Sequence, residues 1–199
     1  MLRQVRRSVL TVKSRVAVAA VLILIAGCSD DGQVVQSPPP ASNEASPVVA
    51  TTDLGCSGTH AEPPDTMTVL INSVALPTSV GYREALQTSA RGEFTHDDAG
   101  RLFAKQGLYF KPGHAFEVIV PDEFRDRLSI GWATRSWRVT VGDCAGYPAD
   151  WMALVGGYWV ADPLCADLIV RSAEGEQRVK IGLGAPCPGQ DPPPEPSDI

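Results

Sequence analysis

The sequence is poor in the residues that most catalytic and metal sites need. It contains three histidines, His60, His96 and His114, and it has no Gly-x-Ser-x-Gly, Ser-x-x-Lys or Cys-x-x-Cys motif. Imidazole is the usual acid–base and metal-binding group near neutral pH, so a nucleophilic or zinc-dependent enzyme lacks its marker residues here. We therefore expect a protein that is not an enzyme, with no catalytic residue, no metal and no cofactor.

Basic residues are scarce once the N-terminal segment is set aside. Five of the 17 Lys and Arg residues lie within the first 15 positions. The remaining chain has 12 basic and 23 acidic side chains, which gives a net charge of −11. A surface with this balance repels a phosphate backbone, which argues against nucleic acid as a partner.

The most apolar run, Val16–Ile25, is too short to cross a membrane comfortably. Its roughly ten residues would form a helix of about 15 Å, whereas the hydrocarbon core of a bilayer is about 30 Å thick. The run follows a basic segment without acids and precedes the small residues Ala26 and Gly27 and then Cys28. This order predicts a secretory signal peptide.

The tetrapeptide Ile25-Ala26-Gly27-Cys28 resembles the lipobox of bacterial lipoproteins. In that family the cysteine sulfur receives a diacylglyceryl group, and cleavage makes the cysteine the new N-terminus. The resemblance implies that Cys28 is the lipidation site and that a lipid anchor holds the protein on the extracytoplasmic face of the cell membrane. An ordinary signal peptide with a chance cysteine is the alternative. Arg6-Arg7-Ser8-Val9-Leu10 also resembles a twin-arginine export motif, and the export route stays open.

Composition divides the chain into four parts. Residues 1–27 are expected to be the signal peptide, and residues 28–64, rich in Ser, Thr, Ala, Asp and Pro, a flexible linker. Residues 65–187 are expected to form one domain. Residues 188–199 should be a disordered tail, because their successive prolines lack the N–H groups that strands and helices use.

Apolar and polar residues alternate with a period of two in several segments of the domain. The predicted strands are Thr66–Val74, Leu102–Phe110, Phe116–Val120, Leu128–Trp132, Trp137–Val141, Met152–Val160, Ala166–Arg171 and Val179–Leu183. Gly156-Gly157 predicts a bulge, Pro121–Asp126 predicts a turn or a single helical turn, and Tyr82–Ser89 is compatible with a short helix. Many short strands without a long helix favour an all-β fold, a single antiparallel two-sheet sandwich with immunoglobulin-like architecture.

With Cys28 assigned to lipid, the other four cysteines predict two disulfides, because their number is even and the protein is expected to be exported to an oxidising compartment. Three pairings are possible. We favour Cys144–Cys165 together with Cys56–Cys187, since the second bond would join the two ends of the domain.

Aromatic side chains provide the candidates for ligand binding. The alternation places Trp132 and Trp137 in the core, whereas Tyr158 and Trp159 must point to opposite faces of one strand. Trp151 follows a turn. Trp151, Tyr158 and Trp159 are therefore the candidates for a recognition surface.

Acidic clusters offer a weaker interpretation. A hydrolase with a nonstandard site would require His96 or His114 to meet Asp97, Asp98 or Asp122 in the fold. The simpler interpretation places His96, Asp97 and Asp98 in a solvated loop and gives His114 a structural role at a strand entrance. It pairs the acidic residues around Asp122 with neighbouring arginines.

The segment Lys111–Gly189 resembles small envelope lipoproteins of high-G+C Gram-positive bacteria, through Gly156-Gly157-Tyr158-Trp159-Val160 and Gly182-Leu183-Gly184-Ala185-Pro186-Cys187. The resemblance covers about 80 residues and implies the location and the fold rather than an activity. We expect a non-catalytic, membrane-anchored module that contacts another component of the cell envelope, a protein or a glycan. Small-ligand binding or delivery through the aromatic residues is the alternative.

Overall fold

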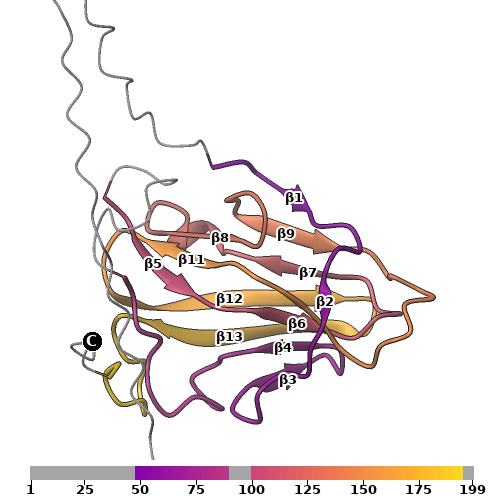
Figure 1. Cartoon of the computed structure of the whole chain (residues 1–199). Coiled ribbons are helices and arrows are strands. Elements are labelled where there is room, and N and C mark those ends of the chain that lie inside the picture. The colour runs from indigo at the N-terminus through magenta and orange to yellow at the C-terminus, as the bar shows by residue number, and fades with distance from the viewer. Residues whose placement is uncertain (1–47, 90–99, 195–199) are drawn as a thin grey trace, which may run out of the picture. The chain divides into compact units, whose positions relative to one another are not determined.

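The strands form two packed layers (Figure 1). The computed structural model describes residues 48–89 and 100–194. The first layer is a five-stranded sheet whose pairs are antiparallel except for the parallel pair at one edge. In spatial order its strands are β1 (Thr52–Asp53), β9 (Arg138–Val141), β7 (Phe116–Ile119), β12 (Leu164–Ser172) and β13 (Gly175–Leu183).

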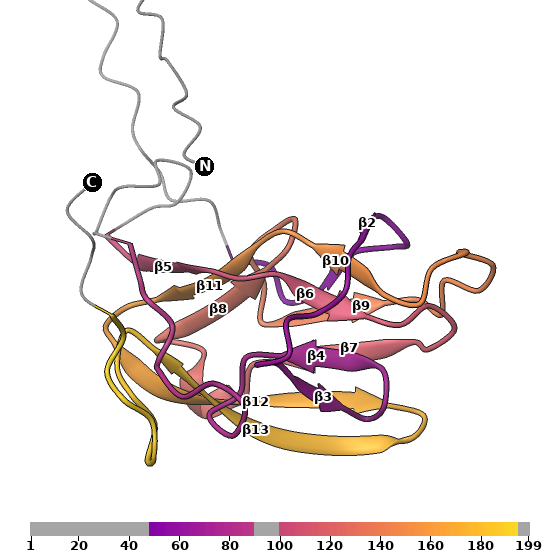
Figure 2. The ribbon, with the colours of Figure 1, turned by 60° about the horizontal axis from the view of Figure 1, so that its bottom comes forward.

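The second layer consists of two ladders that share one register. One ladder has the order β2 (Thr59–His60), β10 (Met152–Leu154), β6 (Leu108–Phe110), β4 (Val74–Leu76) and β3 (Thr68–Leu70). The other has the order β5 (Leu102–Lys105), β11 (Gly157–Val160) and β8 (Leu128–Gly131). Met152 opposes Phe110 in the first ladder and Tyr158 opposes Ala104 in the second, so no extra residue separates the ladders. β5 therefore runs into β6 along one line (Figure 2), and the predicted all-β, antiparallel two-layer fold is confirmed.

Two predicted strands are interrupted where the two ladders meet. Leu102–Phe110 and Met152–Val160 each divide into two short strands. The predicted bulge at Gly156-Gly157 is wrong, because the register is the same on both sides. The ladder breaks because the Trp132 indole Nε1 donates to the Gln106 carbonyl at 2.9 Å, while the Gln106 N–H donates to the Gly156 carbonyl at 2.8 Å.

Other local predictions had mixed outcomes. The single helical turn expected after Pro121 is confirmed as a 3₁₀ turn at Asp122–Phe124. The segment predicted as one strand, Thr66–Val74, is instead the hairpin β3–β4, because Ile71 and Asn72 adopt φ values of 40° and 58° that reverse the chain. The segment Tyr82–Ser89 forms no helix, and within it Glu84 and Leu86 make single bridges to Asp191 and Leu183.

The core lies between the layers. β12 shows the alternation most clearly, since Leu164, Ala166, Leu168 and Val170 are buried and the residues between them are half-buried. Trp132 is 6% exposed and belongs to the core as predicted. Trp137 is only half-buried and lies at the margin of the core, where the Trp137 Nε1 donates to the Arg125 carbonyl at 3.1 Å.

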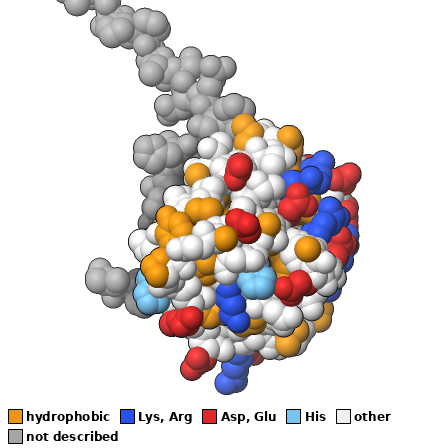
Figure 3. Space-filling model, turned by 90° about the vertical axis from the view of Figure 1, so that its right-hand side faces the viewer, with side chains coloured by type: hydrophobic (Ala, Val, Ile, Leu, Met, Phe, Trp, Pro, Cys, Tyr) orange, Lys and Arg blue, Asp and Glu red, His pale blue; other side chains and the backbone are white. Residues whose placement is uncertain are grey.

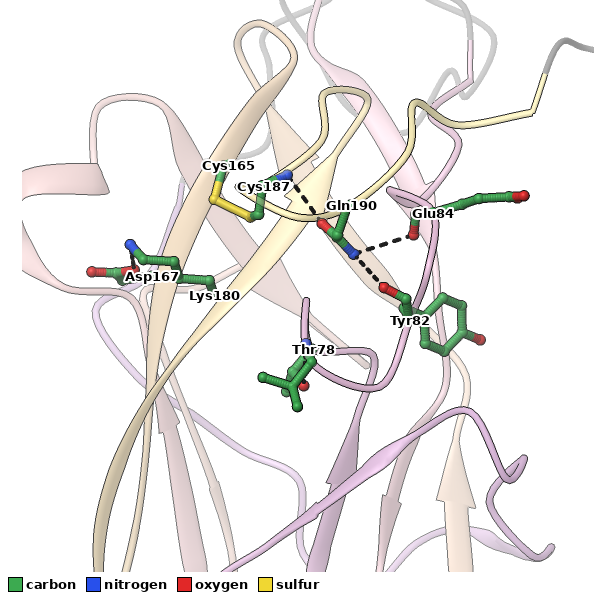
Figure 4. Close-up of a disulfide and its surroundings, with 9 residues drawn as sticks. Thr78, Tyr82, Glu84, Cys165, Asp167, Lys180, Cys187 and Gln190 are labelled. Atoms are coloured by element: carbon green, nitrogen blue, oxygen red, sulfur yellow. Dashed lines mark hydrogen bonds and ion pairs between the residues drawn. A yellow bond between two sulfur atoms is a disulfide. The ribbon is translucent and has the colours of Figure 1, made fainter.

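The cysteines form two disulfides, Cys56–Cys144 with a Cα–Cα distance of 5.4 Å and Cys165–Cys187 with 4.9 Å. The predicted pairs Cys144–Cys165 and Cys56–Cys187 are therefore wrong. β1 pairs in parallel with β9, so Cys56 and Cys144 follow neighbouring strands that end side by side. Cys165 lies opposite Gly182 in the β12–β13 ladder, and the chain turns back after β13 to bring Cys187 beside it (Figure 4).

The fold extends beyond the domain boundaries expected at residues 65 and 187. β1 and β2 both lie in the expected linker, and Leu54 between them is only 7% exposed. Beyond Cys187, the Gln190 side chain donates to the Tyr82 carbonyl at 2.9 Å and accepts from the Cys187 N–H at 3.1 Å (Figure 4). Segments rich in proline are thus held by hydrogen bonds that composition alone does not reveal.

We predict that Gly156→Ala destabilises the fold. A Cβ atom at Gly156 would collide with the Gly131 carbonyl oxygen, which belongs to the backbone and cannot move aside cheaply. The free energy of unfolding, measured by chemical denaturation, should fall by about 1–3 kcal/mol. Gly142→Ala is the matched control, since a Cβ there meets no heavy atom within 4 Å. Equal stability of the two variants would contradict the close packing at the junction of the ladders.

Candidate functional site

The aromatic residues predicted to bind a ligand do not form one surface. Tyr158 is completely buried. Trp151 is 8% exposed and lies beneath Lys111, whose Nζ is 5.1 Å from the centre of the indole ring. Trp159 is half-buried against Phe103, with 4.6 Å between the ring centres. The opposite orientations predicted for Tyr158 and Trp159 are confirmed, but the three candidates lie in three separate environments.

Tyr158 is a structural residue with an unusual hydroxyl group. Its ring meets that of Trp132 edge-on at 5.8 Å, and its oxygen has no hydrogen-bond partner among the residues that the structure describes. Burial, and to a smaller extent the nearby Tyr82, raises the pKa of Tyr158 well above its ordinary value. The group therefore stays protonated and cannot serve as a base near neutral pH.

Asp122, which was considered for catalysis, and its neighbour Glu123 are engaged in ion pairs. Asp122 lies 2.7 Å from Arg125, and Glu123 lies 3.0 Å from Arg178. A hydrogen bond from its own backbone, reinforced by Arg178, lowers the pKa of Glu123. Glu123 is therefore stabilised as a carboxylate, which does not suit a proton donor.

The histidines do not gather with these acids. His114 precedes β7 and Asp122 follows it, so the two lie toward opposite ends of that strand, and His114 Nδ1 instead lies 3.1 Å from Glu174. His60 is exposed in β2. The candidates His96, Asp97 and Asp98 lie outside the described residues. Within the described parts of the chain, no group of three or more His, Cys, Asp and Glu side chains could hold a metal ion.

The outer face of the first layer carries a network of ion pairs that spans four strands. Acidic and basic side chains alternate along one side of the end view in Figure 3, whereas hydrophobic side chains gather on the other side. The pairs with their N–O distances are Arg138–Glu117 (3.6 Å), Arg171–Glu117 (3.5 Å), Arg171–Glu176 (2.7 Å), Arg178–Asp167 (3.1 Å) and Lys180–Asp167 (2.8 Å). Three of these residues, Glu176, Arg178 and Lys180, come from β13.

A groove of about 520 Å³ separates β13, the edge strand of one layer, from β3, the edge strand of the other. We call the groove together with these two strands the open side. Its lining residues are Thr68, Leu70, Thr78, Ser79, Val80, Gln177, Arg178, Val179 and Lys180. Val80 is 89% exposed and Val69 on β3 is 48% exposed, so apolar surface faces solvent here. The open side is the candidate functional site.

Part of the β13 edge is unpaired. The Ser79 N–H donates to the Lys180 carbonyl at 2.7 Å, which shows that the backbone groups of Lys180 face away from β12. Because this direction alternates along a strand, the N–H and C=O groups of Glu176 and Arg178 face the same way. No described residue provides a backbone partner for them on this edge. Farther along the strand, Leu86 covers the edge: its N–H donates to the Gly182 carbonyl, and its carbonyl accepts from the Gly184 N–H.

Sequence reasoning missed the open side, although one signal for it was present. Glu176, Arg178 and Lys180 place a charged side chain at every second position of one strand, which is typical of an exposed edge that is protected against aggregation.

Comparisons of the chain with protein-family models, with curated proteins and with solved structures found no match. Within residues 48–89 and 100–194, no helix has the length and apolar character needed to cross a membrane.

We predict that Tyr158→Phe preserves or increases stability. The variant keeps the ring contact with Trp132 and removes a buried hydroxyl that no described residue satisfies, so the free energy of unfolding should rise by about 1 kcal/mol. Above about pH 10 the unfolded wild-type chain ionises this tyrosine while the folded chain does not, so wild-type stability falls as the pH rises and the variant avoids this loss. Urea denaturation at pH 7 and pH 10.5 measures both effects. Tyr109→Phe, on a half-buried ring, is the control, and a strongly destabilised Tyr158→Phe would contradict the assignment.

Proposed function

We propose that this chain is a lipid-anchored, extracytoplasmic binding module without catalytic activity, and that its open side receives an extended segment of an envelope protein. The observation that carries the proposal is the unpaired edge of β13 beside a groove. Addition of a strand to such an edge is a common mode of peptide recognition.

The lipid anchor is supported by the sequence and by the cysteine chemistry. Cys28 lies outside the described residues, and its proposed role depends on the lipobox-like tetrapeptide. The two disulfides agree with it, because structural disulfides persist mainly in exported proteins. The proposed location is the extracytoplasmic face of the cell membrane.

A protein partner suits the open side better than a glycan or a small ligand. The exposed edge presents backbone donors and acceptors in alternation, which another extended backbone matches. Stacking on sugars or on an apolar ligand requires exposed rings, and none of the residues that line the groove is aromatic. The carboxylates near the open side, Asp167 and Glu123, are paired with Arg178, which supports recognition rather than acid–base chemistry.

The anchor predicts the behaviour of Cys28→Ala. The wild-type chain should be found in the membrane fraction, with diacylglyceryl-modified Cys28 as its N-terminal residue in mass spectrometry. Cys28→Ala should lose the modification and the cleavage that depends on it, while Ser29→Ala should keep both. Wild-type protein with a free Cys28 thiol would refute the anchor without affecting the proposed binding site.

Strand addition predicts different behaviour for two substitutions at Arg178. Arg178→Pro removes the outward N–H of the edge and leaves the β12 ladder intact, because that N–H faces away from β12. Arg178→Thr removes the same charge but keeps the N–H. Binding of the partner, followed by co-purification from solubilised envelopes, should fall at least about tenfold with the proline variant and much less with the threonine variant. Equal binding by both variants would exclude addition of a strand at this edge.

A further inference from the structure

We infer that the extended segment received by the open side is β13 of a second copy of this chain. The inference rests on the binding site proposed above and names its occupant. The two β13 strands would pair antiparallel about a two-fold axis at Gln177, and the five-stranded sheets of the two copies would become continuous.

The backbone of β13 is arranged for this pairing. The outward groups of Glu176 and Arg178 are the ones without a backbone partner among the described residues. With the axis at Gln177, Glu176 lies opposite Arg178 of the second copy and Arg178 lies opposite Glu176 of the second copy. Both are outward-facing residues, so each of these two pairs can exchange two N–H···O=C bonds. Gln177 then lies opposite its own copy in a pair without hydrogen bonds.

The charges select this register. Glu176 and Arg178 point to the outer face of the sheet, and the proposed register places opposite charges across the two-fold axis twice. A shift of two residues in one direction places Glu176 opposite Glu176, and a shift in the other direction places Arg178 opposite Arg178. Opposite charges across strands stabilise a pair and like charges destabilise it. Because Ser79 already bonds to Lys180 and β13 begins at Gly175, only the charges within Gly175–Val179 enter the shared ladder, and within this stretch β13 is complementary to itself in one register only.

The pairing surface is accessible but short. Residues Gly175–Arg178 and Lys180 are exposed. Ser79 and Leu86 already bond to the edge between Lys180 and Gly184, which limits the shared ladder to Gly175–Val179. A ladder of this length forms a weak contact in dilute solution. Two copies anchored in one membrane would have a much higher effective concentration, which favours the pair.

The existing ion pairs of β13 do not prevent the association. Glu176 Oε2 lies 2.7 Å from Arg171, and Arg178 Nη1 contacts both Asp167 and Glu123. A carboxylate accepts about four hydrogen bonds and a guanidinium donates five, so each group can take a further partner across the axis. All these side chains are about half exposed except Asp167, at 14%, so little desolvation is needed.

A charge exchange tests the register with the full-length chain purified in detergent. Arg178→Glu and Glu176→Arg each convert two attractive cross-axis pairs into two repulsive ones, and sedimentation equilibrium should show dimerisation weakened by at least about tenfold. The double variant E176R/R178E exchanges the two charges and should return to within about threefold of the wild type. The contacts of Glu176 with Arg171 and of Arg178 with Asp167 stay lost in the double variant, so a purely structural role predicts no recovery.

Disulfide cross-linking in membranes provides a second measurement that does not depend on detergent. Strand pairs without hydrogen bonds are the closer kind, so the Cβ atoms of Gln177 and its counterpart should lie about 4.5 Å apart. A disulfide can span this distance, so mild oxidation should cross-link the Gln177→Cys variant into a dimer. Val155→Cys is the control, because this residue is 74% exposed and lies on the second layer away from β13.

The outcomes separate the inference from the proposed function. A monomer at every concentration, a double variant no better than the single variants, or equal cross-linking at both positions would overturn self-pairing. If Arg178→Pro then still abolished binding of a different envelope protein, strand addition at the open side would stand. Loss of dimerisation by Arg178→Pro but not by Arg178→Thr supports both.

Discussion

The ladder between β12 and β13 is the interaction on which the rest of this structure depends. Its nine residue pairs join Leu164 to Leu183 and Ser172 to Gly175. β12 is covered on its other side by β7, so β13 is left as the edge of the sheet. The same ladder aligns Cys165 with the returning Cys187 and places the charges of β13 on the outer face. The core, one disulfide and the open side therefore share a single register.

The fold class could be predicted from the sequence because burial on one face of a strand requires alternation. This signal is local, and it located β7, β9, β12 and β13. The disulfide pairing could not be predicted in this way. Cys56 reaches Cys144 only because β1 adds to β9 in parallel, and no residue near either cysteine encodes which strand β1 will join.

The candidate site could be predicted only in part, because it too depends on contacts between distant parts of the chain. The alternation predicted only the second half of β13, Val179–Leu183, and not Gly175–Arg178, where the edge is unpaired. Whether a strand is central or at an edge also depends on what the rest of the chain covers. For the aromatic residues, the sequence predicted exposure where the structure shows burial. Trp151 follows a turn, as expected, but Met67 and Ala75 pack against it from distant parts of the chain. The break at Gly156 arises because the Trp132 side chain takes a carbonyl group that a regular ladder would use.

The two edges of the five-stranded sheet differ in a way that controls the size of any assembly. β1 is two residues long, whereas five of the nine residues of β13, Gly175–Val179, lie outside the part of the edge that Ser79 and Leu86 cover. A two-residue strand offers too few backbone groups to template another chain, so only one edge of the sheet is competent for growth. If copies associate only through this edge, no competent edge is left for a third copy once two copies have paired. In the pairing inferred above, growth of the five-stranded sheet would therefore stop at two copies and would not continue as a fibre.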